Sequence, residues 1–252
     1  MSSYVNPPAK SMAHVLHKTF YSRAYQQELG YNIYLPSEYN PLDTQKRYAV
    51  QYHLHGFQED ESTDVAPMLP AMVRGHRIVV LVNNTPMVEG REDFYDEEML
   101  IDELIPLIDR EYNTIPTREG RCLSGFSMGG NMAFCYAVQN RAVFSSVVAY
   151  AGTYHHSFSK EPQTVGMPRE KAGALYDEML RAGCDVQAGH VLCLIRENAD
   201  WLRCDMDIEL RVGSDDILIC DNEIVHMHLD ALGIPHGYQV FDGVAHWLGG
   251  LV

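Results

Sequence analysis

The chain has 252 residues, of which 46% are hydrophobic and 21% are charged, a composition typical of a globular protein with a sizeable core. With 34 acidic against 19 basic residues, its formal net charge is −15 at pH 7. A surface this negative repels phosphate backbones and anionic lipids, so we expect no nucleic-acid partner and no membrane partner. A small molecule of neutral or weak charge is the partner that the charge balance favours.

Targeting signals and cysteines bear on the compartment. The first 18 residues contain no continuous apolar stretch of the kind that a signal peptide requires. No segment approaches the roughly 18 uncharged apolar residues of a membrane-spanning helix. The six cysteines form neither a CxxC pair nor a zinc-finger pattern. We therefore expect buried free thiols and a cytoplasmic protein. A mature secreted form without its leader stays open as the alternative.

The first part of the chain predicts mainly strands. Residues 17–22 and 28–36 indicate two early strands, the second of which is closed by a proline and a polar turn. Residues 48–56 are β-branched, aromatic and apolar enough for a buried strand that ends at a glycine. A helix is expected within 62–74, and the apolar run 77–85 indicates a second buried strand.

The middle of the chain alternates helix and strand. Residues 96–112 place apolar side chains at helical spacing, with acidic residues concentrated at the start, where the helix dipole favours them. A short strand at 121–126 is followed by a helix of small residues at 128–139. Residues 145–152 form the next predicted buried strand.

The last part completes an α/β pattern. A strand at 206–213, a helix near 220–232 and a strand at 236–243 follow the long interval 153–205, which has helical pieces but no convincing strand. Alternating strands and helices predict a mostly parallel sheet of about eight strands covered on both faces. We expect a single domain over 1–252, with 153–205 inserted over the carboxyl edge of the sheet, where substrates bind in such folds.

One motif predicts a nucleophile. Gly125-Phe126-Ser127-Met128-Gly129 fits G-x-S-x-G and stands between a predicted strand and a predicted helix. A sharp strand-to-helix turn exposes the serine, and the two glycines let neighbouring backbone approach without a Cβ clash. The helix N-terminus then directs N–H groups at developing negative charge. Without this strand–turn–helix setting, the motif would often be a chance match.

A serine hydroxyl needs a base to accept its proton, and α/β-hydrolases place an acid and then a histidine after the serine. His246 lies in a loop after the last predicted strand and is the candidate base. Asp215 and Asp216 follow the strand before it; Asp216 is our choice for the acid, with Asp215 in reserve. The alternative for each residue is an ordinary solvated loop side chain.

Two N–H groups are needed to stabilise the tetrahedral intermediate. One is expected from Met128, after the nucleophile, and the other from Phe57, which follows Gly56 at the end of a strand. His53 and His55 share one face of that strand and are expected to pack or to hydrogen-bond rather than to catalyse.

The histidines near 226 do not predict a metal site. His226 and His228 are two residues apart on a predicted helix, so they lie on different faces and have poor geometry for a shared metal. We therefore predict no metal site, and the proposed serine chemistry requires no cofactor.

Several segments together resemble the esterase D-like family of α/β-hydrolases, which includes S-formylglutathione hydrolase, tributyrin-type esterases and the feruloyl and acetyl-xylan esterases of carbohydrate esterase family one. The resemblance runs over nearly the whole chain and is carried by YNIYLP, YHLHG, ELIPLIDREY, LSGFSMGGNMA, RVGSDD and the final HW. It implies an α/β-hydrolase fold and a carboxylic ester hydrolase. By position, it implies Ser127 as nucleophile, Asp216 as acid, His246 as base, and Phe57 and Met128 as oxyanion donors.

The sequence departs from the family at one loop and at its end. The loop after Gly56 reads FQEDEST, which is unusually acidic and is expected either to reshape the pocket or to bind a cation. Family members usually carry a further helix after the catalytic histidine, whereas this chain has six residues after His246.

The substrate is predicted from aromatic residues. Tyr154, His155, His156 and Trp201 in the insertion, and Trp247 beside the base, are candidates for an aromatic wall that binds a sugar or a phenolic acyl group, although the same residues suit core packing. We favour acetyl or feruloyl esters of plant polysaccharide, so the partner is a small-molecule or saccharide ester. A general short-chain acyl esterase, an S-formylglutathione hydrolase-like thioesterase and a non-catalytic carbohydrate- or partner-binding relative are the alternatives. A homo-oligomer stays open.

Overall fold

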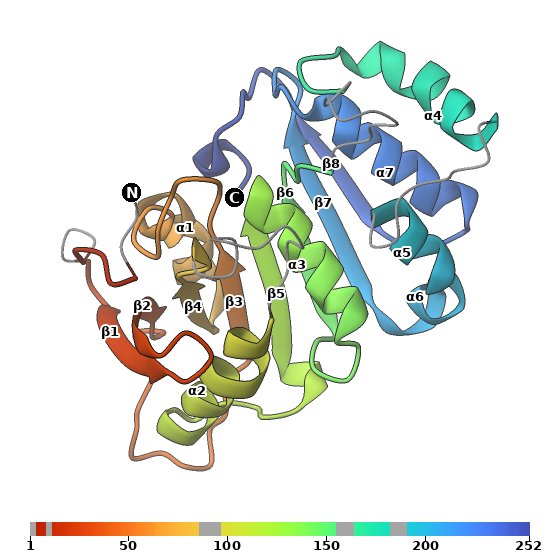
Figure 1. Ribbon diagram of the computed structural model, residues 1–252. Helices are drawn as coiled ribbons and strands as arrows, with labels where there is room; N and C mark the ends of the chain where they lie inside the picture. Colours follow the sequence, from red (N-terminus) through yellow and green to blue (C-terminus); the bar gives the residue numbers. More distant parts are fainter. Residues whose placement is uncertain (1–3, 9–11, 86–96, 155–163, 182–190) are drawn as a thin grey trace.

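An eight-stranded sheet forms the centre of the computed structural model, which describes the chain apart from residues 1–3, 9–11, 86–96, 155–163 and 182–190 (Figure 1). Within the described residues the spatial order of the strands is β1-β2-β4-β3-β5-β6-β7-β8. The strands are β1 (Val15–Ser22), β2 (Gln27–Tyr34), β3 (Val50–Leu54), β4 (Ile78–Val82), β5 (Arg121–Phe126), β6 (Ser146–Tyr150), β7 (Asp207–Gly213) and β8 (Gly237–Phe241). The predicted sheet of about eight strands is confirmed.

The direction of the strands sets where a site can form. β1 pairs with β2, and β2 with β4, in the antiparallel sense, whereas every other neighbouring pair is parallel. All five residues of β3 and of β4 are buried, as strands covered on both faces should be. β4 is a continuous apolar run, whereas β3 also buries Gln51 and His53. The carboxyl ends of the parallel strands meet at one edge, and loops that follow them can bring distant residues together.

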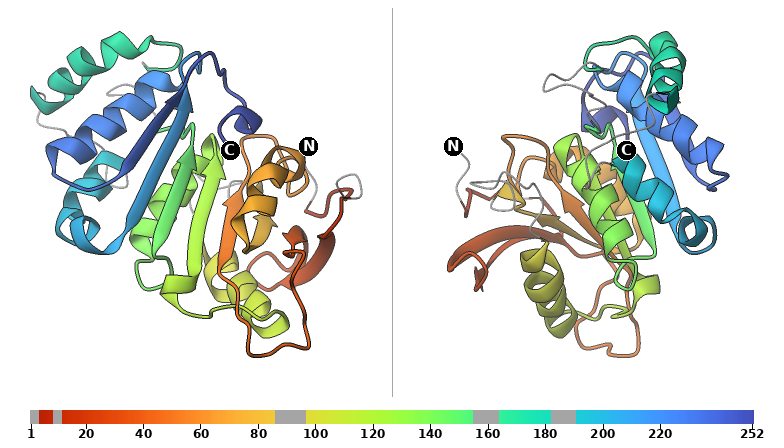
Figure 2. Two further views of the ribbon diagram at one scale, coloured as in Figure 1. Left: turned by 180° about the vertical axis from the view of Figure 1, so that it is seen from behind. Right: turned by 45° about the vertical axis from the view of Figure 1, so that its right-hand side comes forward.

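Helices cover both faces of the sheet (Figures 1 and 2). The helices are α1 (Val65–Gly75), α2 (Ile105–Glu111), α3 (Met128–Gln139), α4 (Ala172–Arg181), α5 (Val191–Glu197), α6 (Ala199–Asp205) and α7 (Ile219–Ala231). The π-helical segment η2 (Met99–Leu104) leads into α2, and the short 3-10 helices are η3 (Arg118–Gly120), η4 (Arg169–Lys171) and η5 (Leu248–Gly250). None of the helices in the described part of the chain is both long and apolar enough to cross a bilayer.

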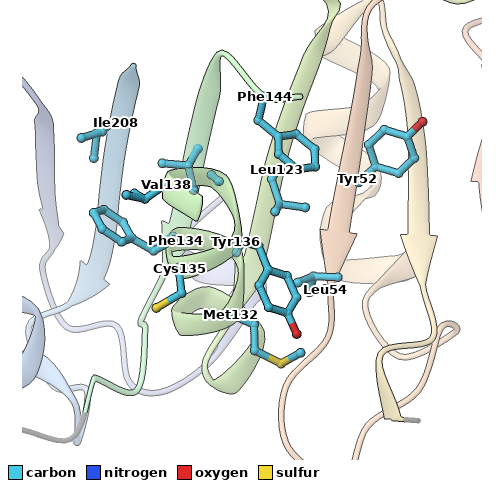
Figure 3. Close-up of a cluster of buried hydrophobic side chains, with 14 of the residues drawn as sticks. Tyr52, Leu54, Leu123, Met132, Phe134, Cys135, Tyr136, Val138, Phe144 and Ile208 are labelled. Carbon is cyan, nitrogen blue, oxygen red and sulfur yellow. The ribbon is translucent and has the colours of Figure 1, made fainter. Parts of the chain in front are cut away.

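Two apolar clusters hold these layers together. On one face, α2, α3, α5 and α7 bury the larger cluster; Figure 3 shows Tyr136 of α3 beside Leu54 of β3, and Phe134 of α3 on the side of Ile208 of β7. On the other face, α1 and the chain end at η5 share the smaller cluster. Leu248 and Leu251 are both buried there, so the chain end packs under the loop that carries His246.

The interval 153–205 is only partly where the sequence predicted it. The expectation that it lies over the carboxyl edge of the sheet is wrong for its last two helices. α5 packs on α3 and α7, and α6 on α5, so both cover the face of the sheet, while α4 packs on the outside of α7 (Figure 1). The reason is their apolar residues: Leu192, Ile195 and Leu202 are buried in the larger cluster and cannot also face a substrate. α6 ends at Asp205, immediately before β7 begins at the opposite edge.

The cysteines agree with the expected buried thiols. The five described cysteines are free, and four of them are buried, whereas Cys204 is exposed. Burial raises the pKa of Cys135 to about 12, because the interior disfavours a thiolate. The compartment itself stays a prediction.

Candidate active site

Ser127 sits on the tight turn that the motif predicted, between the end of β5 and the start of α3. Its backbone has φ 55° and ψ −117°, an uncommon conformation for a residue with a side chain. The two motif glycines make this turn sterically feasible. A Cβ on Gly125 would lie 2.0 Å from the carbonyl oxygen of Gly129, and one on Gly129 would lie 2.2 Å from that of Leu54.

The three residues predicted for the triad lie together. Ser127 Oγ is 3.0 Å from His246 Nε2, and His246 Nδ1 is 2.9 and 3.0 Å from the two carboxylate oxygens of Asp216. The loops after β5, β7 and β8 supply the three residues, so they converge at the carboxyl edge of the sheet. Ser127 is 8% exposed.

The two neighbouring aspartates have different surroundings. The carboxylate of Asp216 is buried and also accepts the Leu218 N–H at 2.8 Å. The side chain of Asp215 is exposed and accepts the hydroxyl of Ser214. The geometry therefore favours Asp216, which contacts His246, over the reserve choice of Asp215, whose exposed carboxylate is bonded to Ser214 instead.

The loop that carries His246 is tied to the loop that carries Asp216. The backbone N–H groups of Ser214 and Asp215 donate to the carbonyls of Phe241 and Val244. A Cβ on Gly213 would lie 1.8 Å from the Val244 carbonyl, so only glycine lets the two loops approach this closely.

Phe126 orients the imidazole, a role that the sequence did not reveal. Its ring stacks on that of His246 with 4.7 Å between centroids and 28° between planes. The stacking and the two hydrogen bonds hold the imidazole between Ser127 and Asp216. Phe126 occupies the x position before the serine in G-x-S-x-G. The motif does not specify an aromatic residue there, so the sequence could not predict this contact with His246.

The two expected oxyanion donors border the nucleophile. Met128 is the first residue of α3, where backbone N–H groups have no acceptor inside the helix. Phe57 follows Gly56 in the loop after β3, and its ring is 67% exposed. A Cβ on Gly129 would contact the backbone of Leu54 and His55, so the start of α3 is packed closely against the end of β3.

His55 orients the peptide that bears the second donor. Its Nε2 is 3.2 Å from the Asn84 N–H, so this nitrogen must accept, and Nδ1 then carries the proton and donates to the Gly56 carbonyl at 2.8 Å. In a trans peptide the carbonyl of Gly56 and the N–H of Phe57 point in opposite directions, so anchoring one aims the other. Burial lowers the pKa of His55, which keeps the ring neutral and this tautomer in place.

The acidic loop after Phe57 is held by its own hydrogen bonds. Glu59 accepts the Gly56 N–H at 2.7 Å, and burial raises the pKa of its carboxyl. Glu61 is buried and accepts the backbone and side-chain N–H groups of Asn6 as well as facing His17 at 3.2 Å. The contacts of Glu59 and Glu61 therefore hold in place the loop that follows the expected donor Phe57.

A second serine–histidine–aspartate arrangement lies below the first. His53 is 3.0 Å from both Ser124 Oγ and Asp64 Oδ2. Ser124 has no exposed surface, and its hydroxyl is bound to the Tyr52 carbonyl. No substrate can reach it, so this network joins β3, β5 and the start of α1, in agreement with the structural role expected for His53.

The predicted substrate-binding aromatics are mostly elsewhere. Tyr154 is 3% exposed and packs edge-on against Phe134 in the core, and Trp201 packs beside Arg118 at the amino edge of the sheet, away from the triad. Both expectations are wrong, because these rings fill the apolar space between helices and sheet. Trp247 is 62% exposed directly after His246 and stays a candidate. His155 and His156 lie outside the described residues.

Comparison with known sequences defines the class of protein. A model of the Putative esterase family matches residues 22–249, so the chain belongs to that family. An endo-1,4-beta-xylanase/feruloyl esterase of Xylanibacter ruminicola is 28% identical over 172 residues, which are 58% of this chain and 23% of that protein. Esterase Rv1288 of Mycobacterium tuberculosis is 27% identical over 49% of this chain and 29% of its own length. The chain thus spans less than a third of these curated relatives.

Solved structures show the same fold. A ferulic acid esterase superposes with a TM-score of 0.71 at 21% identity, over 93% of this chain and 91% of that one. The S-formylglutathione hydrolase of Staphylococcus aureus superposes with a TM-score of 0.72 at 15% identity, over 94% of both chains. The expected α/β-hydrolase fold is confirmed.

Proposed function

We propose that the chain is a carboxylic ester hydrolase that works through an acyl-enzyme on Ser127. The observation that carries the proposal is the 3.0 Å contact between Ser127 Oγ and His246 Nε2, with Asp216 on the other ring nitrogen. Membership of the esterase family agrees with it. A nucleophile on a strained turn, a base and an acid that orients the base form the arrangement that acyl transfer requires.

The mechanism follows from this geometry. His246 accepts the proton of Ser127 as Oγ attacks the ester carbonyl, and Asp216 stabilises the imidazolium. The oxyanion accepts hydrogen bonds from the N–H groups of Phe57 and Met128. The alcohol leaves with the proton held by His246, and water then repeats the sequence on the acyl-enzyme. The roles of all five residues are part of the proposal.

Replacement of the nucleophile tests it. Ser127→Ala should lower the turnover of p-nitrophenyl acetate by at least about 10³-fold, since triad members act as a unit. Ser37→Ala, in an exposed turn, is the matched control and should keep full activity. A fluorophosphonate probe should label the wild type and Ser37→Ala but not Ser127→Ala. Labelling that persists in Ser127→Ala, or unchanged turnover, would show that another residue is the nucleophile.

We further propose acetyl or feruloyl esters of plant polysaccharide as substrates. The names of the Xylanibacter relative and of the ferulic acid esterase support this class. Two exposed aromatic rings adjoin proposed catalytic residues: Phe57 at the oxyanion loop and Trp247 beside His246. Such rings can contact a hydroxycinnamoyl group or a sugar. A panel of methyl ferulate, acetylated xylan and p-nitrophenyl butyrate tests the assignment; preference for the butyrate alone would indicate a general short-chain esterase.

A thioesterase that hydrolyses S-formylglutathione is the second candidate, supported by the fold shared with the Staphylococcus aureus enzyme. Rates with S-formylglutathione and methyl ferulate, measured side by side, separate the two. A non-catalytic carbohydrate- or partner-binding relative is the alternative from another class. A non-catalytic protein would fail to react with fluorophosphonate at Ser127. The contacts among Ser127, His246 and Asp216 argue against this alternative.

A further inference from the structure

Three potential metal ligands meet at the edge of the sheet opposite the triad. His226 and Asp230 are one turn apart on α7, and His236 immediately precedes β8. His226 Nδ1 is 2.8 Å from His236 Nε2, His226 Nε2 is 3.5 Å from Asp230 Oδ2, and His236 Nε2 is 4.0 Å from Asp230 Oδ1. One donor atom from each residue lies within 4.8 Å of the other two.

The two imidazoles are oriented by their surroundings. His236 Nδ1 is 2.8 Å from the Ile234 carbonyl, to which it donates, so Nε2 presents a lone pair to the cluster. A backbone carbonyl on the outer nitrogen is how protein metal sites commonly fix a histidine ligand. The ring of His226 stacks on Tyr238 at 4.2 Å, and the Tyr238 hydroxyl donates to Glu223.

The cluster is also reachable. His236 lines a cavity of about 520 Å³ at the amino edge of the sheet. The side chain of His236 is 3% exposed, that of His226 is 24% exposed, and that of Asp230 is 64% exposed. An ion can therefore enter from solvent and bind between two oriented rings and a carboxylate free to move.

We propose that His226, Asp230 and His236 bind one Zn²⁺ ion, with water as the fourth ligand. Two imidazole nitrogens and a carboxylate oxygen are a common donor set for zinc. At bonds of about 2.0–2.1 Å, tetrahedral donors stand about 3.4 Å apart. The 2.8 Å contact uses Nδ1 of His226 and the 3.5 Å contact uses its Nε2, and only one of these nitrogens can bind the ion. One donor atom from each residue already lies within 4.8 Å of the other two, so side-chain rotations can bring three donors to the tetrahedral separation.

The sequence argument against a metal site concerned His226 and His228, which are two residues apart on α7. His228 faces the other side of α7, where it contacts the Tyr176 hydroxyl and the Leu192 carbonyl. The partner of His226 is instead His236, ten residues on, which the turn between α7 and β8 brings back to the helix. An ion here ties the end of α7 to the start of the edge strand β8. It acts on stability rather than on the triad.

Zinc binding by the purified full chain tests the proposal. After treatment with EDTA and its removal, we expect one Zn²⁺ per chain in a titration against a competing chelator dye, and a rise in Tm because only the folded state holds the site. His236→Gln and Asp230→Asn should each weaken binding at least about tenfold and abolish the rise in Tm. Asp230 is exposed, so its replacement should fold normally.

Two controls separate this site from others. His14→Gln, at an exposed histidine near β1, should bind as the wild type does. His246→Gln removes the imidazole of the triad, another place where zinc could bind, and should leave the rise in Tm intact. The proposal is overturned if Asp230→Asn and His236→Gln bind zinc like the wild type, or if His246→Gln abolishes binding.

Discussion

The residues around Ser127 are constrained by contact with backbone rather than by side-chain chemistry. At Gly129, any Cβ would meet the Leu54 carbonyl at 2.2 Å, and a carbonyl in the central strand β3 cannot move without disturbing its ladder. The glycine therefore sets the distance between the start of α3 and the oxyanion loop. The same contact that permits the turn also brings the two proposed N–H donors together.

Gly129→Ala should consequently lose both stability and activity. Forcing a methyl group into this space costs about 1–3 kcal/mol by overpacking, and the shift of α3 misplaces the Met128 N–H. Gly173→Ala is the matched control, because its Cβ would meet only the Met227 methyl at 3.9 Å and alanine favours a helix by about 0.5–1 kcal/mol. Urea unfolding and p-nitrophenyl acetate turnover measure both effects. Equal behaviour of the two variants would refute the steric explanation.

Asp215 and Asp216 are adjacent, so replacing each in turn compares a buried with an exposed carboxylate. Asp216→Asn keeps the shape but favours the wrong tautomer of His246, so we expect kcat to fall by about 10³–10⁴-fold. Asp215→Asn changes an exposed carboxylate bonded to Ser214 and should stay within a few-fold of the wild type. Steady-state kinetics of both variants with one ester measure kcat. A larger loss of kcat in Asp215→Asn than in Asp216→Asn would contradict the assignment of Asp216 as the acid.

At the scale of elements, β3 and its following loop do more than the sequence suggested. His53 and His55 alternate with Leu54 along this segment, and both are buried. His53 links β3 to β5 and α1, whereas His55 links the Gly56 carbonyl to the segment after β4. The loop that carries Phe57 is therefore held from β3, β4 and the acidic residues at once, as a preorganised oxyanion donor requires.

His55→Phe should lower kcat at least about tenfold while changing KM less, because the loss falls on an interaction made in the transition state.

His55→Phe should also alter the dependence of stability on pH. Since burial lowers the folded-state pKa of His55, the unfolded chain binds a proton first, so the wild-type free energy of unfolding falls as pH drops below about 6.5. The variant should lack this part of the decline. Urea unfolding between pH 5 and 8, alongside kinetics, measures both; a change in KM alone would contradict the positioning role.

Periodicity predicted the elements well and the use of aromatic residues poorly. The strand and helix order, Ser127 and His246 followed from periodicity and from a motif placed between a strand and a helix. The sequence left the acid open between Asp215 and Asp216, and the contact of Asp216 with His246 separates them. Tyr154 and Trp201 were placed at the substrate site, yet a ring that fills a core and a ring that lines a pocket have the same sequence signature. Phe126 over His246 and His226 beside His236 depend on loops that fold back, which no spacing rule describes.

At the scale of the whole molecule, the net charge of −15 should act on every substrate that approaches. Glu59 in the loop beside the proposed oxyanion donor is partly exposed and adds to this field at the site itself. The energy of an anion near such a surface is unfavourable and is screened by salt over about 8–10 Å at physiological ionic strength. A neutral ester such as methyl ferulate meets no such barrier, whereas glutathione thioesters carry a net negative charge at neutral pH.

We therefore expect an effect of salt that depends on substrate charge. Raising the ionic strength from about 0.02 to 0.3 M should increase kcat/KM for the anionic ester mono-p-nitrophenyl succinate a few-fold, because the Debye length shortens from roughly 20 Å to roughly 6 Å. The neutral ester p-nitrophenyl acetate should change little over the same range and controls for salt effects on the enzyme. The direction in which salt changes kcat/KM for the anionic ester separates the candidate functions. If salt lowered kcat/KM for the anionic ester, a local cationic site would outweigh the overall charge, and an anionic substrate such as S-formylglutathione would become the better assignment.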